Sequence, residues 1–215
     1  MKEDSETSPL PSPWKGEGET YPLLFKEGTK GRLKDKAAGG RYLNKDDLVI
    51  LGIDPGSGVT GYGVVKGSHD KAVLIDYGTI KVSYKKPLSL RLEEIYSCIT
   101  DVISRIKPDQ LAIEEAFYSK NAKSALVMGQ VRGVVLLAGA QAKIPIAEYS
   151  PREVKSSIVG TGAASKTQVQ FMVKNILQLK NLPEPEDASD ALAIALCHLN
   201  KLVSKKRLKE MIKDT

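Results

Sequence analysis

The chain has 215 residues, of which 41% are hydrophobic and 27% are charged, and its formal net charge is +6. This length predicts one domain with extensions, and the hydrophobic fraction is enough for a full-sized core. Its two cysteines, Cys98 and Cys197, lie far apart in apolar helical patterns, outside any CxxC or Cys/His cluster. They indicate reduced core cysteines in a cytoplasmic protein and argue against a disulfide framework or a zinc site.

Membrane insertion is not expected from the sequence. No uninterrupted apolar run reaches the roughly 18 residues needed to span a bilayer. The N-terminus is polar and has no signal-peptide core.

Residues 1–47 differ in character from the rest of the chain. The stretch from Ser8 to Gly18 is rich in proline, glycine and charge, and the stretch from Lys26 to Arg41 also lacks periodicity. We therefore expect 1–47 to be a disordered N-terminal extension. Because the folded pattern begins abruptly at Leu48, an initiation codon assigned too far upstream would look the same. An intact mass of the natural protein equal to the full chain would refute that alternative.

From Leu48 onward the hydrophobic pattern predicts alternating strands and helices. Strands are expected at 48–54, 58–66, 72–82, 110–114 and 144–148. Helices are expected at 88–106, 121–142, 151–158, 166–179 and 187–203, followed by a basic, frayed tail at 204–215. Three hairpin-like strands followed by alternating helices and strands imply an α/β domain over 48–203. We expect a five-stranded mixed sheet flanked by helices, the ribonuclease-H-like architecture, with the first strand central.

Two of the expected strands end on an acidic residue. Asp54 closes the apolar run Val49–Ile53, and Glu114 closes Leu111–Ile113. A carboxylate at the end of a core strand is costly to bury unless it is paired or binds a cation. Glu115 should point to the opposite face, because side chains alternate along a strand. Taken alone, Asp54 could be a turn residue and Glu114 a solvated strand end.

Two further acids, Asp187 and Asp190, begin the last expected helix. Their i, i+3 spacing places both on one helical face. Taken alone, Asp187 could cap the helix, and Asp190 could be a first-turn acid that the helix dipole stabilises. With Asp54 and Glu114 they make an all-carboxylate set, which suits hard divalent cations.

Such a set is typical of phosphodiester chemistry with two Mg²⁺ ions about 4 Å apart, one activating water and one stabilising the leaving oxygen. No histidine is required, and we expect His69 and His198 to be structural or solvated.

The segment 120–174 has an excess of positive charge, since Glu148 and Glu153 are its only acids. This excess suits a face that binds a polyanion, although an ordinary solvated surface is the simpler explanation. Lys155 and Lys166 could stabilise charge near a scissile phosphate, or could be surface lysines. The pair Phe117-Tyr118 could stack on an exposed base, or pack at a helix start.

Taken together, these segments resemble the RuvC family of Holliday-junction resolvases. The similarity runs in order from about Val49 to Asn200, and 1–47 has no counterpart in it. The matching stretches are Leu51–Gly56, Ala112–Glu115, Asn121-Ala122 through Gly129–Gly133, Val154-Lys155, Val159–Ala163, Lys166–Val169 and Asp187–Ala195.

The resemblance implies a homodimeric, bacterial, cytoplasmic endonuclease of DNA recombination and repair. Such enzymes make paired nicks in four-way DNA junctions with Mg²⁺ or Mn²⁺, leave 5′-phosphate ends, and work with the RuvA–RuvB branch-migration complex. The catalytic and metal-binding acids would be Asp54, Glu114, Asp187 and Asp190. Asp187 is the least fixed of these, because family members vary between Asp and His at its position.

The resemblance also implies that Phe117 stacks at the junction centre and that Lys155 and Lys166 lie near the DNA backbone. We add Tyr118, Lys120, Lys123 and Arg132 as predicted DNA contacts. The dimer is also expected from symmetry, because an isologous dimer matches a junction with near two-fold symmetry. The helix at 121–142, with Val131, Val134, Val135 and Leu137, is a candidate dimer face or else packs on the sheet.

Three alternatives remain open at this stage. The sequence Asp54-Pro55-Gly56-Ser57-Gly58 also resembles the first phosphate loop of actin-like ATPases. That fold normally has two such domains, and here the loop occurs once. A junction-binding protein without catalysis is a second alternative, and a related nuclease acting on RNA or an RNA–DNA hybrid is a third.

Overall fold

The structure is a computed structural model that describes residues 47–68, 71–115 and 122–213, except for the side chains of 206, 207, 210 and 213. Its centre is a five-stranded mixed sheet with the strand order β3-β2-β1-β4-β5. The strands are β1 (Leu48–Asp54), β2 (Val59–Ser68), β3 (Lys71–Lys81), β4 (Gln110–Glu114) and β5 (Ile146–Tyr149). The first three form an antiparallel meander, and β4 and β5 continue the sheet in parallel with β1. The expected architecture is confirmed, with β1 in the middle.

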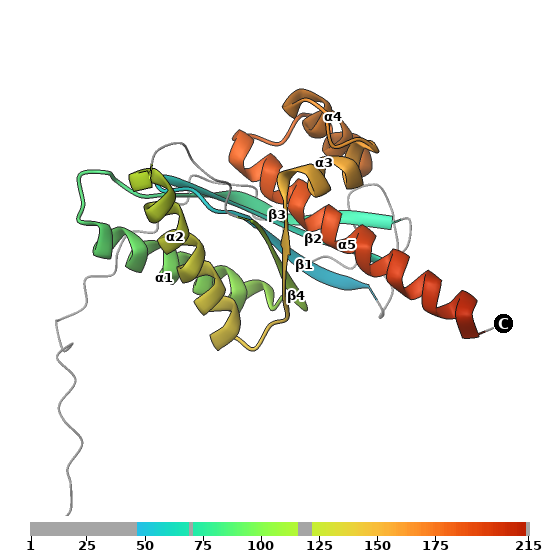
Figure 1. The fold of residues 1–215 in the computed structure, drawn as a ribbon, viewed down its shortest axis with the longest axis horizontal. Coiled ribbons are helices and arrows are strands. Elements are labelled where there is room, and N and C mark those ends of the chain that lie inside the picture. Colours follow the sequence, from blue (N-terminus) through green and yellow to red (C-terminus); the bar gives the residue numbers. More distant parts are fainter. Residues whose placement is uncertain (1–46, 69–70, 116–121, 214–215) are drawn as a thin grey trace, which may run out of the picture.

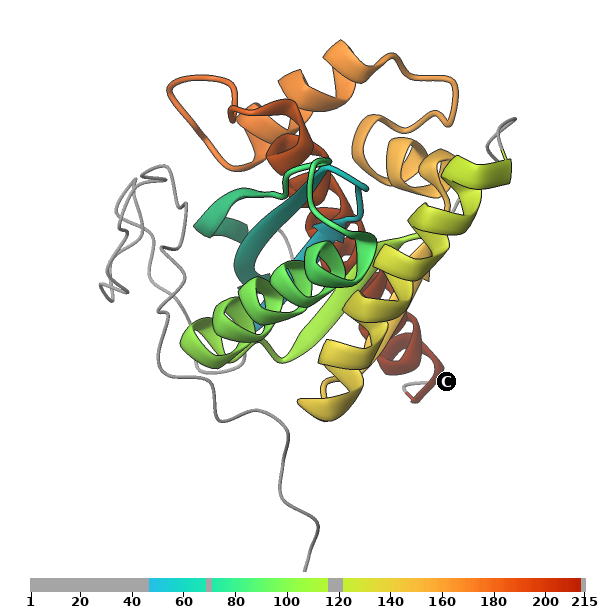
Figure 2. The ribbon, with the colours of Figure 1, turned by 90° about the vertical axis from the view of Figure 1, so that its left-hand side faces the viewer.

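Helices cover both faces of this sheet (Figures 1 and 2). On one face lie α1 (Leu88–Ile106) and α2 (Ala122–Gln141). On the other lie α3 (Pro151–Val159), α4 (Lys166–Ile176) and α5 (Glu186–Lys213). Each layer has its own buried cluster, with Leu51 and Ile53 of β1 in the first and Ile50 in the second. The alternation along β1 therefore decides which layer each of its side chains faces.

The helix α5 lies directly on β1 and β2 because glycines line the strands beneath it. A Cβ atom at Gly52 would stand 2.2 Å from the carbonyl oxygen of Ala191, and one at Gly61 would stand 2.0 Å from that of Asp187. Only glycine permits so close an approach without a shift of the helix. The acidic start of α5 is thereby held against the end of β1.

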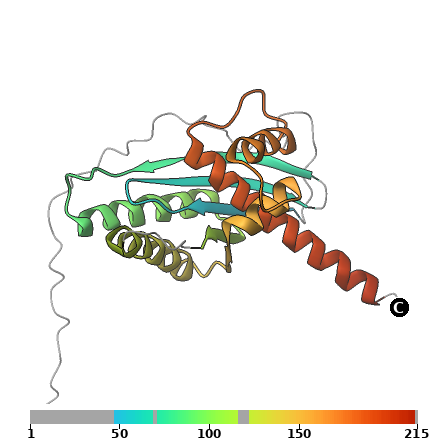
Figure 3. The same ribbon diagram turned by 45° about the horizontal axis from the view of Figure 1, so that its top comes forward.

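The last helix is longer than the sequence pattern predicts. It runs to Lys213 instead of ending near 203, and its second half projects beyond the sheet (Figures 1 and 3). The expected tail at 204–215 has four lysines and one each of Arg, Leu, Glu and Met, all of which are strong helix formers. In contrast, α4 ends at Ile176, before the expected 179, and Gln178 just beyond it has φ of 52°. The extension expected at 1–47 lies outside the described residues apart from Asp47.

The apolar helix α2 has both a buried and an open side. Val131 and Val135 are fully buried in the layer of α1 and α2, so the interpretation that this helix packs on the sheet is correct for them. Leu137 is 50% exposed. By length and composition, α2 is the one described helix that could cross a membrane, with 22% of that stretch buried. Glycine and polar residues interrupt this stretch, so it contains no uninterrupted apolar run of about 18 residues.

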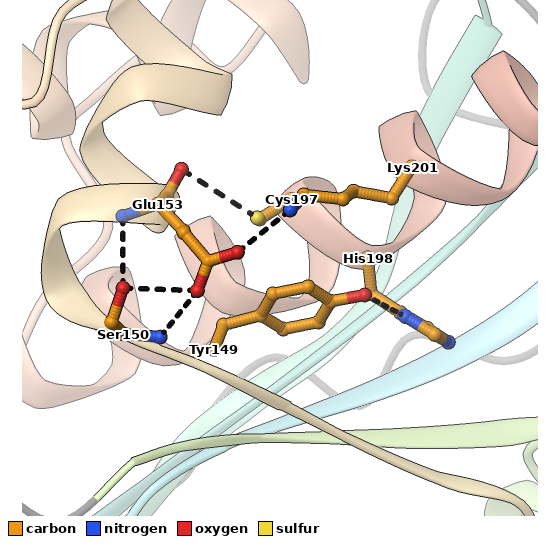
Figure 4. A network of polar contacts seen from close by, with 6 residues as sticks. All are labelled: Tyr149, Ser150, Glu153, Cys197, His198 and Lys201. Carbon is orange, nitrogen blue, oxygen red and sulfur yellow. Dashed lines mark hydrogen bonds and ion pairs between the residues drawn. The ribbon is translucent and has the colours of Figure 1, made fainter.

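A buried polar network ties β4, β5 and α5 together, and Figure 4 shows the part of it between Tyr149 and His198. The Tyr149 hydroxyl lies 2.6 Å from Nδ1 of His198, and Nε2 of His198 lies 2.7 Å from Oε1 of Gln110. Burial, with a smaller effect of Lys205, lowers the pKa of His198 to about 4, so this side chain is neutral near pH 7. The structural role expected for His198 is confirmed, and His69 lies outside the described residues.

A second part of the same network caps α3. The Glu153 carboxylate accepts hydrogen bonds from the backbone N–H and the hydroxyl of Ser150, and pairs with Lys201 of α5 at 2.8 Å (Figure 4). This capping box begins α3 at Pro151, as expected, and fastens it to α5.

Candidate active site

Asp54 and Glu114 end two neighbouring parallel strands at the same edge of the sheet. Ile53 of β1 pairs with Ile113 of β4, so the two acids follow in register. Both isoleucines belong to the layer of α1 and α2. Since successive side chains alternate, the two carboxylates face the opposite layer, toward α5. Glu115 is exposed, and its backbone N–H bonds to the carbonyl oxygen of Tyr149. It does not line the site.

A cleft of about 190 Å³ lies over this edge and collects most of the predicted site residues. It is lined by the acids Asp54, Glu114 and Asp190 and by the lysines Lys155 and Lys166. Its apolar lining, which the sequence reading did not identify, consists of Pro151, Val154, Val169, Ala193 and Ile194. Asp187 is not part of the lining.

The three lining acids repel one another. Burial, followed by the charges of Glu114, Asp190 and Asp187, raises the pKa of Asp54 to about 8. Burial and the charge of Asp190 also raise the pKa of Glu114 above its usual value. Burial raises the pKa of Asp190, and Lys166 opposes that rise. Asp187 is therefore close enough to act electrostatically on Asp54 and Asp190, although its side chain lies outside the cleft.

Lys166 connects the cleft to the start of α5. It is the first residue of α4, directly after the capping residue Ser165. Its ammonium lies 2.9 Å from Oδ2 of Asp190 and 3.0 Å from Oε2 of Glu186. Sequence reasoning missed Glu186, although its position one helical turn before Asp190 was a visible signal. Lys155, on α3, is half-buried and lowers the pKa of Glu114 by its charge.

The donor set fits a hard divalent cation. All the acids that meet at the cleft offer carboxylate oxygens, the ligands that hard divalent cations prefer. Burial, with a smaller effect of the neighbouring acids, raises their pKa values despite the charges of Lys155 and Lys166. Within the described part of the chain, no three His, Cys, Asp or Glu side chains form a ready-made ligand group. Binding a cation would therefore draw the carboxylates together and compete with Lys166 for Asp190.

The structure describes two of the five other predicted DNA contacts. Phe117, Tyr118 and Lys120 lie outside the described residues. Lys123 is exposed in the first turn of α2. Arg132 is ion-paired with Glu148 of β5, so its charge already has a partner within the protein.

Comparison with known proteins shows the family of the chain. The model of the RuvC family, crossover junction endodeoxyribonuclease RuvC, matches residues 50–198. The chain belongs to the RuvC family. A crossover junction endodeoxyribonuclease RuvC from Desulforamulus reducens is 48% identical over 151 residues, which cover 70% of this chain and 93% of that protein.

Solved structures agree with this assignment. Thermus thermophilus RuvC in complex with a Holliday junction substrate is 36% identical with a TM-score of 0.71, over 74% of this chain and 96% of that one. The yeast mitochondrial Holliday junction resolvase Ydc2 is 16% identical with a TM-score of 0.56, over 77% of this chain and 85% of that one, and shows a shared fold. The RuvC-family chain is thus an endonuclease with a ribonuclease-H-like fold and an acidic cleft at the end of its central strand.

Proposed function

We propose that this chain resolves Holliday junctions by metal-dependent, symmetric nicking that leaves 5′-phosphate ends. The observation that carries the proposal is the cleft where Asp54, Glu114 and Asp190 meet Lys155 and Lys166. Membership of the RuvC family supports the substrate class and the metal dependence, and the buried carboxylates at one cleft are consistent with a bound cation.

Asp54, Glu114 and Asp190 would hold the divalent cations, Mg²⁺ or Mn²⁺, with Asp187 as the fourth and outermost acid. When bound, such ions activate a water molecule and stabilise the leaving 3′ oxygen. The lysines have a separate task. Lys166, which lies between Asp190 and Glu186, would present its ammonium to the scissile phosphate. Lys155 supplies a second positive charge on the α3 side of the cleft.

A homodimer would cut both strands. The open side of α2 supports this, because Leu126 is 66% exposed and Leu137 is 50% exposed. Between them, a Cβ atom at Gly129 or Gly133 would meet nothing within 4 Å. Small residues four apart let two helices approach closely. The proposed dimer face is therefore Leu126, Gly129, Gly133 and Leu137, whereas Val131 and Val135 belong to the core.

Other parts of the proposal come from the family resemblance. They are cooperation with the RuvA–RuvB complex, a bacterial cytoplasmic location, and stacking of Phe117 at the junction centre. An actin-like ATPase is not supported, since the matched family is a nuclease.

One comparison of substrates tests the proposal. The purified chain would be incubated in Mg²⁺ with a four-way DNA junction, a linear duplex of the same arm sequence and an RNA–DNA hybrid. We expect paired nicks in the junction alone, none in EDTA, and binding that weakens steeply with salt because phosphate contacts release counterions. Preferential cleavage of the hybrid, or ATP hydrolysis without junction cleavage, would contradict the proposal.

A further inference from the structure

An exposed tyrosine stands beside the loop that follows Asp54. Tyr84 is 70% exposed, and its hydroxyl lies 3.4 Å from Oγ of Ser57 in the β1–β2 loop. The backbone N–H of Val82 bonds to the carbonyl oxygen of Gly58 in the same loop, which fastens the segment of Tyr84 to it. The Tyr84 ring therefore lies at the edge of the sheet where β1 ends with Asp54.

A buried arginine, Arg91, packs against one face of the Tyr84 ring. Arg91 begins the buried stripe of α1, is only 8% exposed, and places its guanidinium carbon 5.1 Å from the centre of the Tyr84 ring. Its Nε has no hydrogen-bond partner, and no carboxylate pairs with it among the described residues. Burying an unpaired charge is costly, and the cation–π contact with the Tyr84 ring offsets part of that cost.

Gly58 leaves room for the Tyr84 ring because it has no side chain. A Cβ atom there would stand 2.2 Å from the Tyr84 hydroxyl oxygen. One ring face is taken by Arg91, and the high exposure of the residue leaves the other face open to solvent. An aromatic ring that is immobilised yet open has lost its conformational freedom before any ligand binds, which lowers the entropic cost of stacking.

The charges around the ring suit a nucleic-acid strand. Lys81 and Lys85 flank Tyr84 and are exposed, and neither has a carboxylate partner among the described residues. With Arg91 they bring three basic side chains to the segment around Tyr84, and basic side chains attract phosphates. Alternating aromatic and basic groups are how proteins bind unpaired nucleotides, with bases on the rings and phosphates on the cations.

We propose that Tyr84, seated on Arg91 and Gly58, is a stacking platform for an unpaired nucleobase of the DNA strand beside the acidic cleft. The proposal rests on the proposed function for its ligand class. It needs a base with a free face, which an opened junction centre or a single strand offers and an intact duplex does not.

The test measures binding of the full-length chain in EDTA, so that no cleavage occurs. The probes are a four-way junction with 2-aminopurine at the branch point, the matching linear duplex, and a single-stranded oligonucleotide. Tyr84→Leu keeps the packing on Arg91 and Gly58 but removes the aromatic face, and Tyr84→Phe keeps the face. Phe171→Ala, an exposed aromatic on α4, is the matched control.

We expect Tyr84→Leu to weaken binding of the junction and the single strand about 5- to 100-fold, the usual loss for one base–aromatic stack. Tyr84→Phe and Phe171→Ala should bind within about twofold of the parental protein, as should every variant on the duplex. Quenching of 2-aminopurine should persist in Tyr84→Phe and disappear in Tyr84→Leu. Equal binding by parental protein and Tyr84→Leu, or a loss in Tyr84→Phe as large as in Tyr84→Leu, would overturn the platform.

Failure of the proposed function would look different. It would appear as a parental protein that neither prefers nor nicks the junction, while the Tyr84 variants still differ on the single strand.

Discussion

Two polar clusters of this protein are built on opposite principles. In the network of Tyr149, His198 and Gln110, each buried group faces a partner. In the cleft, Asp54, Glu114 and Asp190 face one another, and their pKa values are raised. Glu153, which caps α3, has a lowered pKa instead. Hydrogen bonds from Lys201 and Ser150 lower the pKa of Glu153 to about 2.

The difference separates residues that hold the fold from residues that await a ligand. A satisfied polar network stabilises a structure by itself, whereas a set of buried like charges destabilises it until a counter-charge arrives. Changes in the cleft should therefore remove activity without unfolding the protein, and changes in the network should do the reverse.

The largest effect is expected from Asp54→Asn. Asparagine keeps the shape of the side chain but removes the charge that would hold a cation. Junction cleavage in Mg²⁺ should fall by more than about 100-fold, which exceeds the loss from changing a supporting residue of a metal site. Binding of the junction in EDTA should persist. If Asp54→Asn nicked junctions at the parental rate, the assignment of the site would be wrong.

Lys166→Met should come next. It removes the ammonium that stands between Asp190 and Glu186. We expect kcat to fall about 100-fold, the lower end of the loss for one group that stabilises transition-state charge. The matched control is Lys201→Met, which breaks the ion pair with Glu153 in the capping network and should leave kcat unchanged. Equal losses in both variants would mean that Lys166 acts only through the fold.

Stability should depend on pH through Asp54. Its folded pKa of about 8 exceeds the ordinary value of 3.8, so the unfolded chain loses this proton first as the pH rises. In EDTA, the Asp54 contribution to stability therefore falls between about pH 4 and pH 8. Asp54→Asn should remove this slope and raise the free energy of unfolding at pH 8 by about 2 kcal/mol or more, since one pKa unit corresponds to about 1.4 kcal/mol. Thermal melting at pH 5 and pH 8 measures it, and a variant less stable than the parental protein at pH 8 would contradict it.

The smallest effect is expected from Tyr149→Phe. It leaves Nδ1 of buried His198 without its partner, which should cost about 1–3 kcal/mol of stability. Nicking activity per folded molecule should stay at the parental level. A loss of activity with an unchanged melting temperature would show that this network also serves the site.

The meeting of Asp54, Glu114 and Asp190 at one cleft could be predicted from the sequence, but the surroundings of that cleft could not. Asp54 and Glu114 could be recognised because each ends an apolar strand, and the pairing of β1 with β4 brings them together. The ion pair of Arg132 with Glu148 could not be foreseen, because it depends on how α2 crosses β5. The contacts of Tyr84 with Gly58 and Arg91 join the β1–β2 loop, the segment after β3 and α1, so no local sequence pattern could predict them. The extended α5 was missed because its polar second half lacks the apolar spacing that marks a packed helix.

The most direct test of the central claim is the position of bound Mn²⁺ in crystals of the full chain at pH 8, located by anomalous scattering. We predict peaks in the cleft within coordination distance of Asp54 and of Glu114 or Asp190, with the Lys166 ammonium moved off Asp190. Saturated crystals with no peak in this cleft, or with Lys166 still paired to Asp190, would contradict the account.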